Sequence, residues 1–408
     1  MRGLIGEADA VVVGAGALGA SVAFHLARAG TLRVALIDKH DLASQTSPRA
    51  AGLTSQVRTT DLMTRLAMLA VKKIERFEAE TGEPLVYHRS GSLKIARAEE
   101  HLERLRTEVA RGRRLGLDID FVSGGEAQRL LPFLDAAGVL GITYSPSDLY
   151  LEPVQIPLGY ARGAGRLGAT LMPNTAVTGI VTRDGAVEGV ITDHGPIRTP
   201  VVVDAAGAWT RPVAKMANGR IAVIPTRHQL LITEPIDGAI PNLPIARVID
   251  SNVYVRPEKG GLLLGGYESD PVQYDMRDLP AGFQIKDLRL DIGVLRRLGD
   301  TVVTQFPVLR EIKVREHRGG LPTMSADGRH LVGPVSGVRG LFVASGCCVG
   351  GLSISPAVGE VLAAWILAGE PPMDLALLSP DRFGPEFQVE ERLRAQCRWQ
   401  YAHQYSAP

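Results

Sequence analysis

The chain has 408 residues, too many for one small core and a suitable length for a two-lobed enzyme or two domains. Apolar residues make up 45% and charged residues 22%, which is ordinary for a soluble globular protein. The 45 Lys and Arg residues nearly balance the 44 Asp and Glu residues. No net field therefore favours nucleic acid or an anionic membrane surface as a partner.

Targeting and redox signals are sparse. No uninterrupted apolar run of about 18–20 residues is evident, and the N-terminus lacks a signal-peptide pattern. Three cysteines, two of them adjacent (Cys347 and Cys348), are too few for a disulfide framework or a four-cysteine metal site. These features predict a reduced, cytoplasmic protein with no membrane span and no metal.

The clearest motif lies near the N-terminus. A predicted strand at Asp9–Val13 runs into GAGALG, and an alanine-rich helix follows. Gly14 permits the tight turn, Gly16 lets a pyrophosphate approach the backbone, and Gly19 lets helix and strand pack closely. The free N–H groups at the helix N-terminus would then face the phosphates of a dinucleotide.

A second predicted strand, Arg33–Ile37, ends at Asp38. A carboxylate here accepts hydrogen bonds from ribose hydroxyls and disfavours the 2′-phosphate of NADP. The motif fits NAD and FAD alike. However, a small-residue loop at Ser44–Gln56 follows, running into a helix that Asp61 can open. A nicotinamide dehydrogenase would normally continue with further strand–helix units, so this loop favours an extended FAD.

Strand-like runs and helices interleave in the rest of the chain, without a tandem repeat. A charged helix is predicted at 97–117. Strand-rich stretches follow at 175–191, 200–209 and 221–316. The stretch 340–369 predicts a strand, a glycine loop and a helix, with Ser355 as the cap and Pro356 as the first helical residue. The polar tail, 371–408, is expected to pack on the outside.

The order of these motifs resembles the D-amino-acid-oxidase-type flavoproteins over almost the whole chain. Within that superfamily it is most similar to the flavin half of dimethylglycine and sarcosine dehydrogenases. The resemblance is carried by GAGALG with Asp38, TSPRAAGLTSQ, ETGEPLVYHRSGSLKIA, DAAGAW, RHQLLITEP, GGLLLGGYE, GLPTMSADGRHLVG and SPAVGE.

The resemblance implies an α/β (α+β) fold, in which a Rossmann-like FAD-binding lobe carries an inserted substrate lobe with a mixed or antiparallel sheet. The FAD-binding lobe would comprise residues 1–85, 145–220 and 315–370. The substrate lobe would comprise 86–144 and 221–314, leaving 371–408 as a C-terminal tail.

The implied cofactor is FAD. Besides the three motif glycines and Asp38, the cofactor-binding residues would be Lys39, Ser47, Arg49, Ala51, Gly52, Leu53, Val177, Ala206, Gly207, Gly346, Gly350, Gly351, Leu352 and Ser353. Those dehydrogenases carry a histidine, attached covalently to the flavin, where this chain has Arg49. Because a guanidinium cannot make that linkage, we expect non-covalent FAD.

Amine oxidation by hydride transfer to flavin N5 requires a neutral amine. An alkylamine with a pKa of about 10.4 is almost entirely protonated at neutral pH. A desolvated pocket and nearby positive charge would lower that pKa. The resemblance points to His228 as proton acceptor or orienter and to Tyr267 as a hydrogen-bond partner of the amine or carboxylate. Each could instead be an ordinary packing residue.

A substrate carboxylate would suit an arginine fork, which binds it through two hydrogen bonds. The candidates are Arg58, Arg256 and Arg318, and we favour Arg256 because it falls in the predicted substrate-lobe sheet. A surface position is the alternative for each of them.

Three functions are consistent with the sequence. The first is FAD-dependent oxidation of a secondary or tertiary amine or N-substituted amino acid, such as sarcosine, dimethylglycine, proline or an opine, to an imine that hydrolyses. The second is the flavin subunit of a multi-subunit dehydrogenase, which would need partner subunits or an electron-accepting protein. The third is a non-catalytic regulatory flavoprotein.

Overall fold

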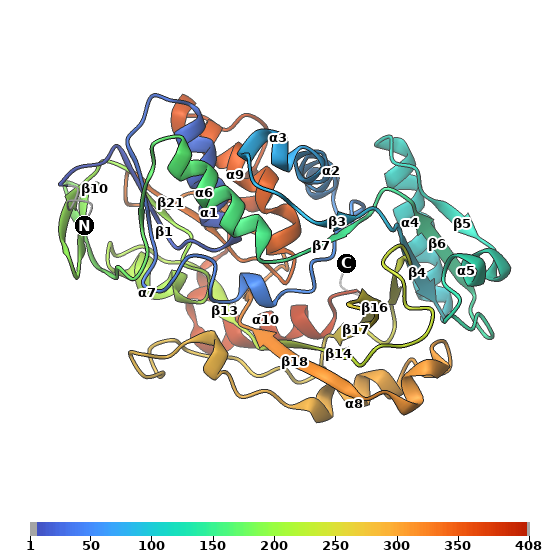
Figure 1. Ribbon diagram of the computed structural model, residues 1–408. Helices are drawn as coiled ribbons and strands as arrows, with labels where there is room; N and C mark the ends of the chain where they lie inside the picture. Colours follow the sequence, from blue (N-terminus) through green and yellow to red (C-terminus); the bar gives the residue numbers. More distant parts are fainter. Residues whose placement is uncertain (1–5, 406–408) are drawn as a thin grey trace.

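A six-stranded sheet forms the core of the first lobe of the computed structural model, which describes residues 6–405 (Figure 1). Only β20 runs antiparallel to its neighbour; the other pairs are parallel. In spatial order the strands are β20 (Leu331–Pro334), β21 (Leu341–Ser345), β12 (Val202–Asp204), β1 (Ala10–Val13), β2 (Val34–Ile37) and β8 (Thr170–Met172).

Both faces of this sheet are covered, which explains why its central strands are continuously apolar. Ala10 and Val12 of β1 pack against helices on one face, whereas Val11 and Val13 pack on the other face. The helices of the first face are α1 (Ala17–Arg28), α2 (Asp61–Glu75), α6 (Gln155–Arg166) and α9 (Gly351–Ala368). The second face carries β9 (Val177–Arg183), β10 (Ala186–Thr192), β11 (Gly195–Arg198) and α7 (Thr210–Lys215).

The second lobe is built on an eight-stranded sheet, antiparallel except where β4 and β15 pair. In spatial order its strands are β18 (Val314–Gly320), β14 (His228–Thr233), β17 (Gly261–Gly266), β16 (Val253–Glu258), β15 (Ile245–Val248), β4 (Ser92–Ala96), β6 (Gly141–Ser145) and β5 (Asp120–Val122). It is accompanied by α4 (Glu99–Arg114), α5 (Gly124–Leu130) and α8 (Ile292–Asp300).

The two faces of the eight-stranded sheet differ in chemistry. Leu93, Ala246 and Val255 belong to an apolar cluster on one face. Side chains point alternately to opposite faces of a strand, so Lys94 and Arg247, which stand opposite each other in register, share the other face. The sheet thus presents a basic surface toward the first lobe.

Short elements complete the fold. They are α3 (Phe77–Thr81), the paired strands β3 (Tyr87–His88) and β7 (Tyr150–Leu151), the paired strands β13 (Val223–Pro225) and β19 (Thr323–Ser325), and α10 (Glu390–Ala402). The fold class expected from the sequence is confirmed, whereas the finer lobe boundaries stay a prediction.

Two expectations from the sequence were wrong. The last long helix, α9, begins at Gly351, so Pro356 lies inside the helix and not at its first position. The tail does not simply cover the outside, because α10 packs on β13 and β19 and buries Cys397 and Tyr401. The expectation of no membrane span stays a prediction, because α9 has the length and hydropathy of such a span, while 67% of it is buried inside the molecule.

Candidate active site

The glycine motif between β1 and α1 cannot carry side chains. Gly14 has a φ of +106°, and a Cβ there would lie 2.4 Å from the carbonyl oxygen of Ala205. A Cβ at Gly19 would lie 1.9 Å from the carbonyl oxygen of Gly14. Gly14 and Gly19 thus allow the tight turn and the close packing of helix and strand that the dinucleotide-binding motif requires.

Asp38 stands at the end of β2, as expected. Its two carboxylate oxygens accept hydrogen bonds from the backbone N–H groups of Ala15 (2.7 Å) and His40 (2.8 Å), and burial raises its pKa. A cavity of about 130 Å³ opens beside it. The predicted cofactor residues that line this cavity are Gly14, Gly16, Asp38, Lys39, Ser47, Val177, Ala206 and Gly207.

Ser47 covers the N-terminus of α1. Its hydroxyl accepts the backbone N–H of Ala17 at 3.0 Å. The bare glycines, the carboxylate at the end of β2 and this hydroxyl are the donors and acceptors that the phosphates and ribose of a dinucleotide need. The residues present therefore fit the adenosine and pyrophosphate half of FAD.

A second cavity, of about 200 Å³, lies between the two lobes. It is lined by the predicted cofactor residues Ala51, Gly52, Leu53, Gly350, Leu352 and Ser353 together with the predicted catalytic residues His228 and Tyr267. The structure thus brings the predicted flavin-binding residues and the basic face of the eight-stranded sheet to one place. Gly346 and Gly351 flank this loop without lining the cavity.

The loop before α9 holds an unusual backbone conformation. Cys348 and Val349 have φ values of +43° and +62°, which non-glycine residues, and β-branched ones above all, rarely adopt. The backbone N–H of Cys348 donates to the carbonyl of Thr323 at 2.9 Å, which helps to hold the loop in this conformation. Together with the N-terminus of α9, this loop suits the pyrimidine end of a flavin.

His228 is the centre of a hydrogen-bonded group. Its Nε2 and Nδ1 lie 2.8 Å from the hydroxyls of Tyr254 and Tyr401, respectively. Burial lowers the pKa of His228 to about 3, so the imidazole is neutral. Since both nitrogens are engaged, His228 would reach a substrate through Tyr254 and not directly.

Tyr267 belongs to an aromatic cluster in the same wall. Its ring lies 5.0 Å from the ring of His228 and 5.3 Å from the ring of Tyr405, measured between centroids. Burial raises the pKa of Tyr267 well above its ordinary value, so the hydroxyl stays protonated and can donate a hydrogen bond.

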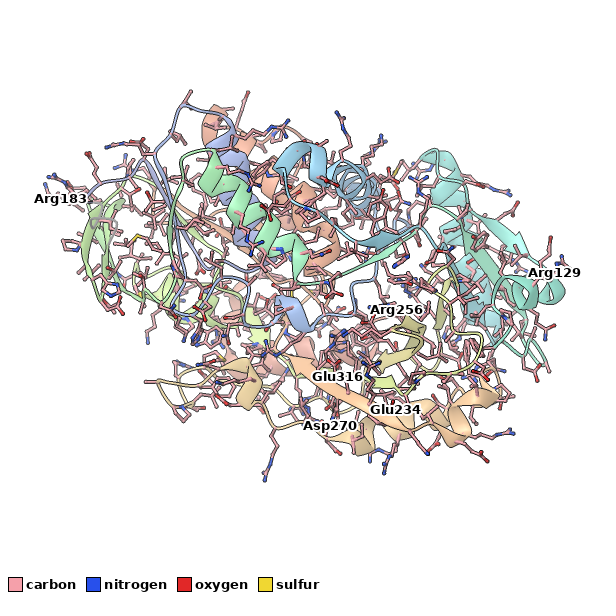
Figure 2. The ribbon with its side chains drawn as sticks, viewed as in Figure 1. Arg129, Arg183, Glu234, Arg256, Asp270 and Glu316 are labelled. Atoms are coloured by element: carbon pink, nitrogen blue, oxygen red, sulfur yellow. The ribbon has the colours of Figure 1, made fainter. Side chains whose placement is uncertain are left out.

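The structure does not support Arg256 as the ligand of a substrate carboxylate. Its guanidinium is buried, forms an ion pair with Glu258 at 2.5 Å and donates to the carbonyl of Ala51 at 2.8 Å. Figure 2 places it in the interior at the junction of the lobes, and it is not among the described residues that line the second cavity. Arg256 does lie in a strand of the substrate-lobe sheet, as predicted, but Glu258 already compensates its charge.

Arg58 and Arg247 are better placed. Both line the second cavity, and neither forms a salt bridge with a carboxylate of residues 6–405. Arg58 donates to the Ser353 hydroxyl at 3.2 Å, and Arg247 donates to the carbonyl of Thr54 at 2.8 Å. Burial and the charge of Arg247 lower the pKa of Arg58. Arg318 does not line this cavity.

Our reading of the sequence missed several cavity residues: Lys94, Arg247, Tyr254, His330, Gln404 and Tyr405. One signal was available, because Arg247 is the lone charged residue in the otherwise apolar strand Ile245–Val248. The tail residues gave no such signal, since they reach the cavity only through the packing of α10.

Comparison with known proteins agrees with this geometry. Residues 9–365 match the family described as FAD dependent oxidoreductase (DAO). The chain belongs to this family. The family predicted from the sequence is confirmed, and FAD is its cofactor.

Among relatives in the DAO family, the mitochondrial dimethylglycine dehydrogenase of Rattus norvegicus is 30% identical over 97% of this chain and 47% of its own length. The mitochondrial sarcosine dehydrogenase of Homo sapiens is 31% identical over 99% of this chain and 45% of its own length. The chain therefore spans about half the length of these curated relatives. The solved L-proline dehydrogenase of P. horikoshii superposes with a TM-score of 0.84 at 23% identity, over 93% of this chain and 98% of that one, which shows a shared fold.

Arg49 takes the place that the covalent histidine occupies in the resemblance to the dehydrogenases. It ends the short 3₁₀ turn Ser47–Arg49, where its guanidinium donates to the carbonyl of Ser44 at 2.6 Å and also to that of Gln45. Burial, and next the charge of Arg318, lower its pKa. Within the DAO-type fold of this chain, Arg49 thus secures the loop that leads to Ala51 and Gly52.

Proposed function

We propose that this chain oxidises a secondary or tertiary amine that carries a carboxylate, such as an N-methylated or cyclic amino acid, to an imine that then hydrolyses. Bound FAD supplies the two-electron oxidant that accepts a hydride. The observation that carries the proposal is that Arg58, Arg247 and Tyr254 line the same cavity, with Arg247 and Tyr254 buried.

The two guanidinium groups suit one substrate carboxylate. Asp148, whose charge acts on Arg58, already accepts hydrogen bonds from Gln56 N and Ser92 Oγ. Its charge offsets one guanidinium, and a substrate carboxylate would offset the other. Lys94 is already paired with Glu108 at 2.5 Å. A buried cation is costly without a partner, so the cavity selects an anionic substrate.

The same charges favour the neutral amine that oxidation requires. Positive charge and desolvation both lower the pKa of an alkylamine, and a shift of about three units corresponds to roughly 4 kcal/mol. The buried hydroxyl of Tyr254 shares a hydrogen bond with His228. Its oxygen can receive the proton that the amine releases. Orientation of the substrate by the two arginines would supply much of the remaining rate acceleration.

The test is an anaerobic absorbance titration of the purified protein against secondary and tertiary amino acids. Bleaching of the flavin band by one class supports amine oxidation and names the substrate family. A yellow protein that no amine bleaches would contradict the proposal and favour a regulatory flavoprotein. Air is then admitted to the bleached protein. Return of the flavin band would show that oxygen is the electron acceptor, whereas a band that stays bleached would point to a partner protein.

A further inference from the structure

The C-terminal tail supplies one wall of the second cavity. Gln400 belongs to the last turns of α10, and Gln404 and Tyr405 follow directly after the helix ends at Ala402. All three line the cavity together with the residues of the two lobes. Tyr405 has the largest side chain of the three, so its ring makes up most of this wall.

Tyr405 connects two parts of the second lobe. On one side its ring packs on Tyr267, with 5.3 Å between the ring centroids and 76° between the ring planes. On the other side it packs against an apolar cluster of Ala96, Leu105 and Ile249, which come from β4, α4 and the residue after β15. Because its contacts reach from the end of β17 to α4, the ring closes the cavity along the basic face of the eight-stranded sheet.

A single residue fixes both tyrosines. The backbone carbonyl of Asn252, in the turn before β16, accepts the N–H of Tyr267 at 3.0 Å. The side-chain oxygen of Asn252 accepts the N–H of Tyr405 at 3.1 Å, and its side-chain nitrogen donates to the carbonyl of Ala402 at 3.0 Å. Asn252 has a φ of +53°, a conformation that asparagine adopts more readily than most residues. The spacing of the two rings is thus set by defined hydrogen bonds.

Two further hydrogen bonds tie the same segment to the cavity walls. The hydroxyl of Tyr401 lies 2.8 Å from Nδ1 of His228. The side-chain amide of Gln404 donates to the carbonyl of Cys348, in the loop before α9, at 3.3 Å. The end of the tail is therefore anchored to both lobes, and Tyr405 cannot give way to a large substrate without breaking these bonds.

We propose that Tyr405 sets the upper size limit of the substrate, so that the cavity admits small N-substituted amino acids and excludes those with a bulky group on nitrogen. The inference rests on the proposed function, which places the carboxylate at Arg58 and Arg247 and the nitrogen near Tyr254. From Tyr254 the aromatic wall continues through Tyr267 to Tyr405. A substituent on the nitrogen therefore extends along this wall and meets the Tyr405 ring.

The size of the cavity agrees with such a limit. Its volume of about 200 Å³ is smaller than the roughly 300–1,000 Å³ of pockets that hold drug-sized ligands, and the flavin has to share it. One methylene group too many or too few in an apolar pocket changes kcat/KM by about 10–200-fold. Loss of the whole Tyr405 ring should therefore give a measurable change in substrate preference.

The kinetic test compares the FAD-loaded parent chain with Tyr405→Ala. Anaerobic flavin reduction is followed with N-methylglycine, N-ethylglycine, N-propylglycine and N-benzylglycine. In the parent chain the efficiency of reduction should fall from the smallest to the largest substituent. In Tyr405→Ala the ratio of the efficiency with N-benzylglycine to that with N-methylglycine should rise at least about tenfold. An unchanged ratio would overturn the proposal.

Three further variants separate the size limit from a structural role. Asn252→Gly keeps the left-handed backbone and removes the side-chain bonds to the tail, so it should raise the same ratio. Equal slowing with all four amines would instead indicate that the segment only stabilises the fold. Tyr405→Phe keeps the ring and should keep the parent ratio. Trp399→Ala is the matched control, because Trp399 is a 39% exposed aromatic residue of α10 and is not among the described residues that line the cavity.

A second readout needs no turnover. N-acetylglycine and N-benzoylglycine carry the carboxylate and a small or bulky group on an amide nitrogen, which is not oxidised. Their dissociation constants are measured from the change in flavin absorbance. Tyr405→Ala should bind N-benzoylglycine at least about tenfold more tightly relative to N-acetylglycine than the parent chain does.

The binding series also distinguishes this inference from the proposed function. If no amine bleaches the flavin but Tyr405→Ala gains affinity for N-benzoylglycine alone, the proposed oxidation fails while the size limit stands. If an amine bleaches the flavin and the relative affinities are the same in both proteins, the oxidation stands and the size limit is wrong. If neither acid binds to either protein, the cavity is not a carboxylate site and both fail.

Discussion

The ring of Tyr254 fills the space that a side chain at Gly265 would take. The two residues stand opposite each other across β16 and β17, and a Cβ at position 265 would lie 2.2 Å from the Tyr254 hydroxyl. Glycine at this place therefore lets Tyr254 lie flat across the sheet and reach His228. The hydrogen bond that links cavity and imidazole depends on the absence of one methyl group.

Gly265→Ala should displace Tyr254 and break its bond to His228. We expect kcat/KM for a bleaching amine to fall by roughly 10²-fold, the usual contribution of one proton-transfer group, with FAD still bound. The control is Gly299→Ala in α8, where a Cβ would make an ordinary 3.7 Å contact with Leu264. Wild-type kinetics in Gly265→Ala would show that the position of Tyr254 does not matter.

Arg247→Met removes a positive charge from the cavity. That charge lowers the pKa of a bound amine, so its loss should raise the apparent pKa in the pH profile of flavin reduction. The rate should fall at neutral pH and recover toward high pH, while KM rises because a carboxylate partner is lost. Arg129→Gln, on the exposed far end of the second lobe, is the control (Figure 2). An unchanged pH profile in Arg247→Met would show that Arg247 does not act on the bound amine.

Val349→Gly should stabilise the protein. Val349 has a φ of +62°, and a β-branched residue in that region costs about 1–3 kcal/mol, whereas glycine adopts it freely. We expect a higher Tm, offset in part by the greater entropy of the unfolded chain. The same change at Val389, which is 50% exposed with an extended φ of −79°, should not raise Tm. A lower Tm for Val349→Gly would mean that its side-chain packing outweighs the strain.

Flavin should leave the protein on denaturation, because the sequence resemblance places Arg49 where a histidine would make the covalent linkage. After acid precipitation we expect the yellow colour in the supernatant and a protein mass without added flavin. Arg49→His tests the converse, since it restores the residue type that makes the linkage. Flavin that stays with the precipitated parent chain would contradict the non-covalent assignment.

Acid should destabilise this protein through its buried histidines. Burial is the main cause that lowers the pKa of His25, His228 and His330 to about 3 each. The unfolded chain, with histidines near their ordinary pKa of about 6.5, then binds more protons between those values. The free energy of unfolding should therefore fall as the pH drops from about 6.5 toward 3, by at most roughly 1.4 kcal/mol per pH unit for each histidine.

Urea unfolding at a series of pH values measures that slope. His330→Asn should flatten it, because both ring nitrogens of His330 are buried and lack partners among residues 6–405. His194→Asn, at a half-exposed site, should leave the slope unchanged. Equal slopes in the parent chain and His330→Asn would refute this account of acid sensitivity.

The sequence by itself determined the features that depend on local spacing. The run from Ala10 through Gly14 and Gly19 to Asp38 specified the cofactor motif, because strand, turn and helix are set by neighbouring residues. The continuous apolar strands implied a covered sheet, and the positions of His228 and Tyr267 followed from matched motifs.

Only the tertiary structure decided which charges are free. Arg256 and Arg247 lie in neighbouring strands and look alike in sequence, yet Glu258 compensates one and no described carboxylate pairs with the other. Likewise, Tyr401 meets His228 across 173 positions of chain. Such contacts depend on how two lobes and a tail pack, and no local periodicity records that packing.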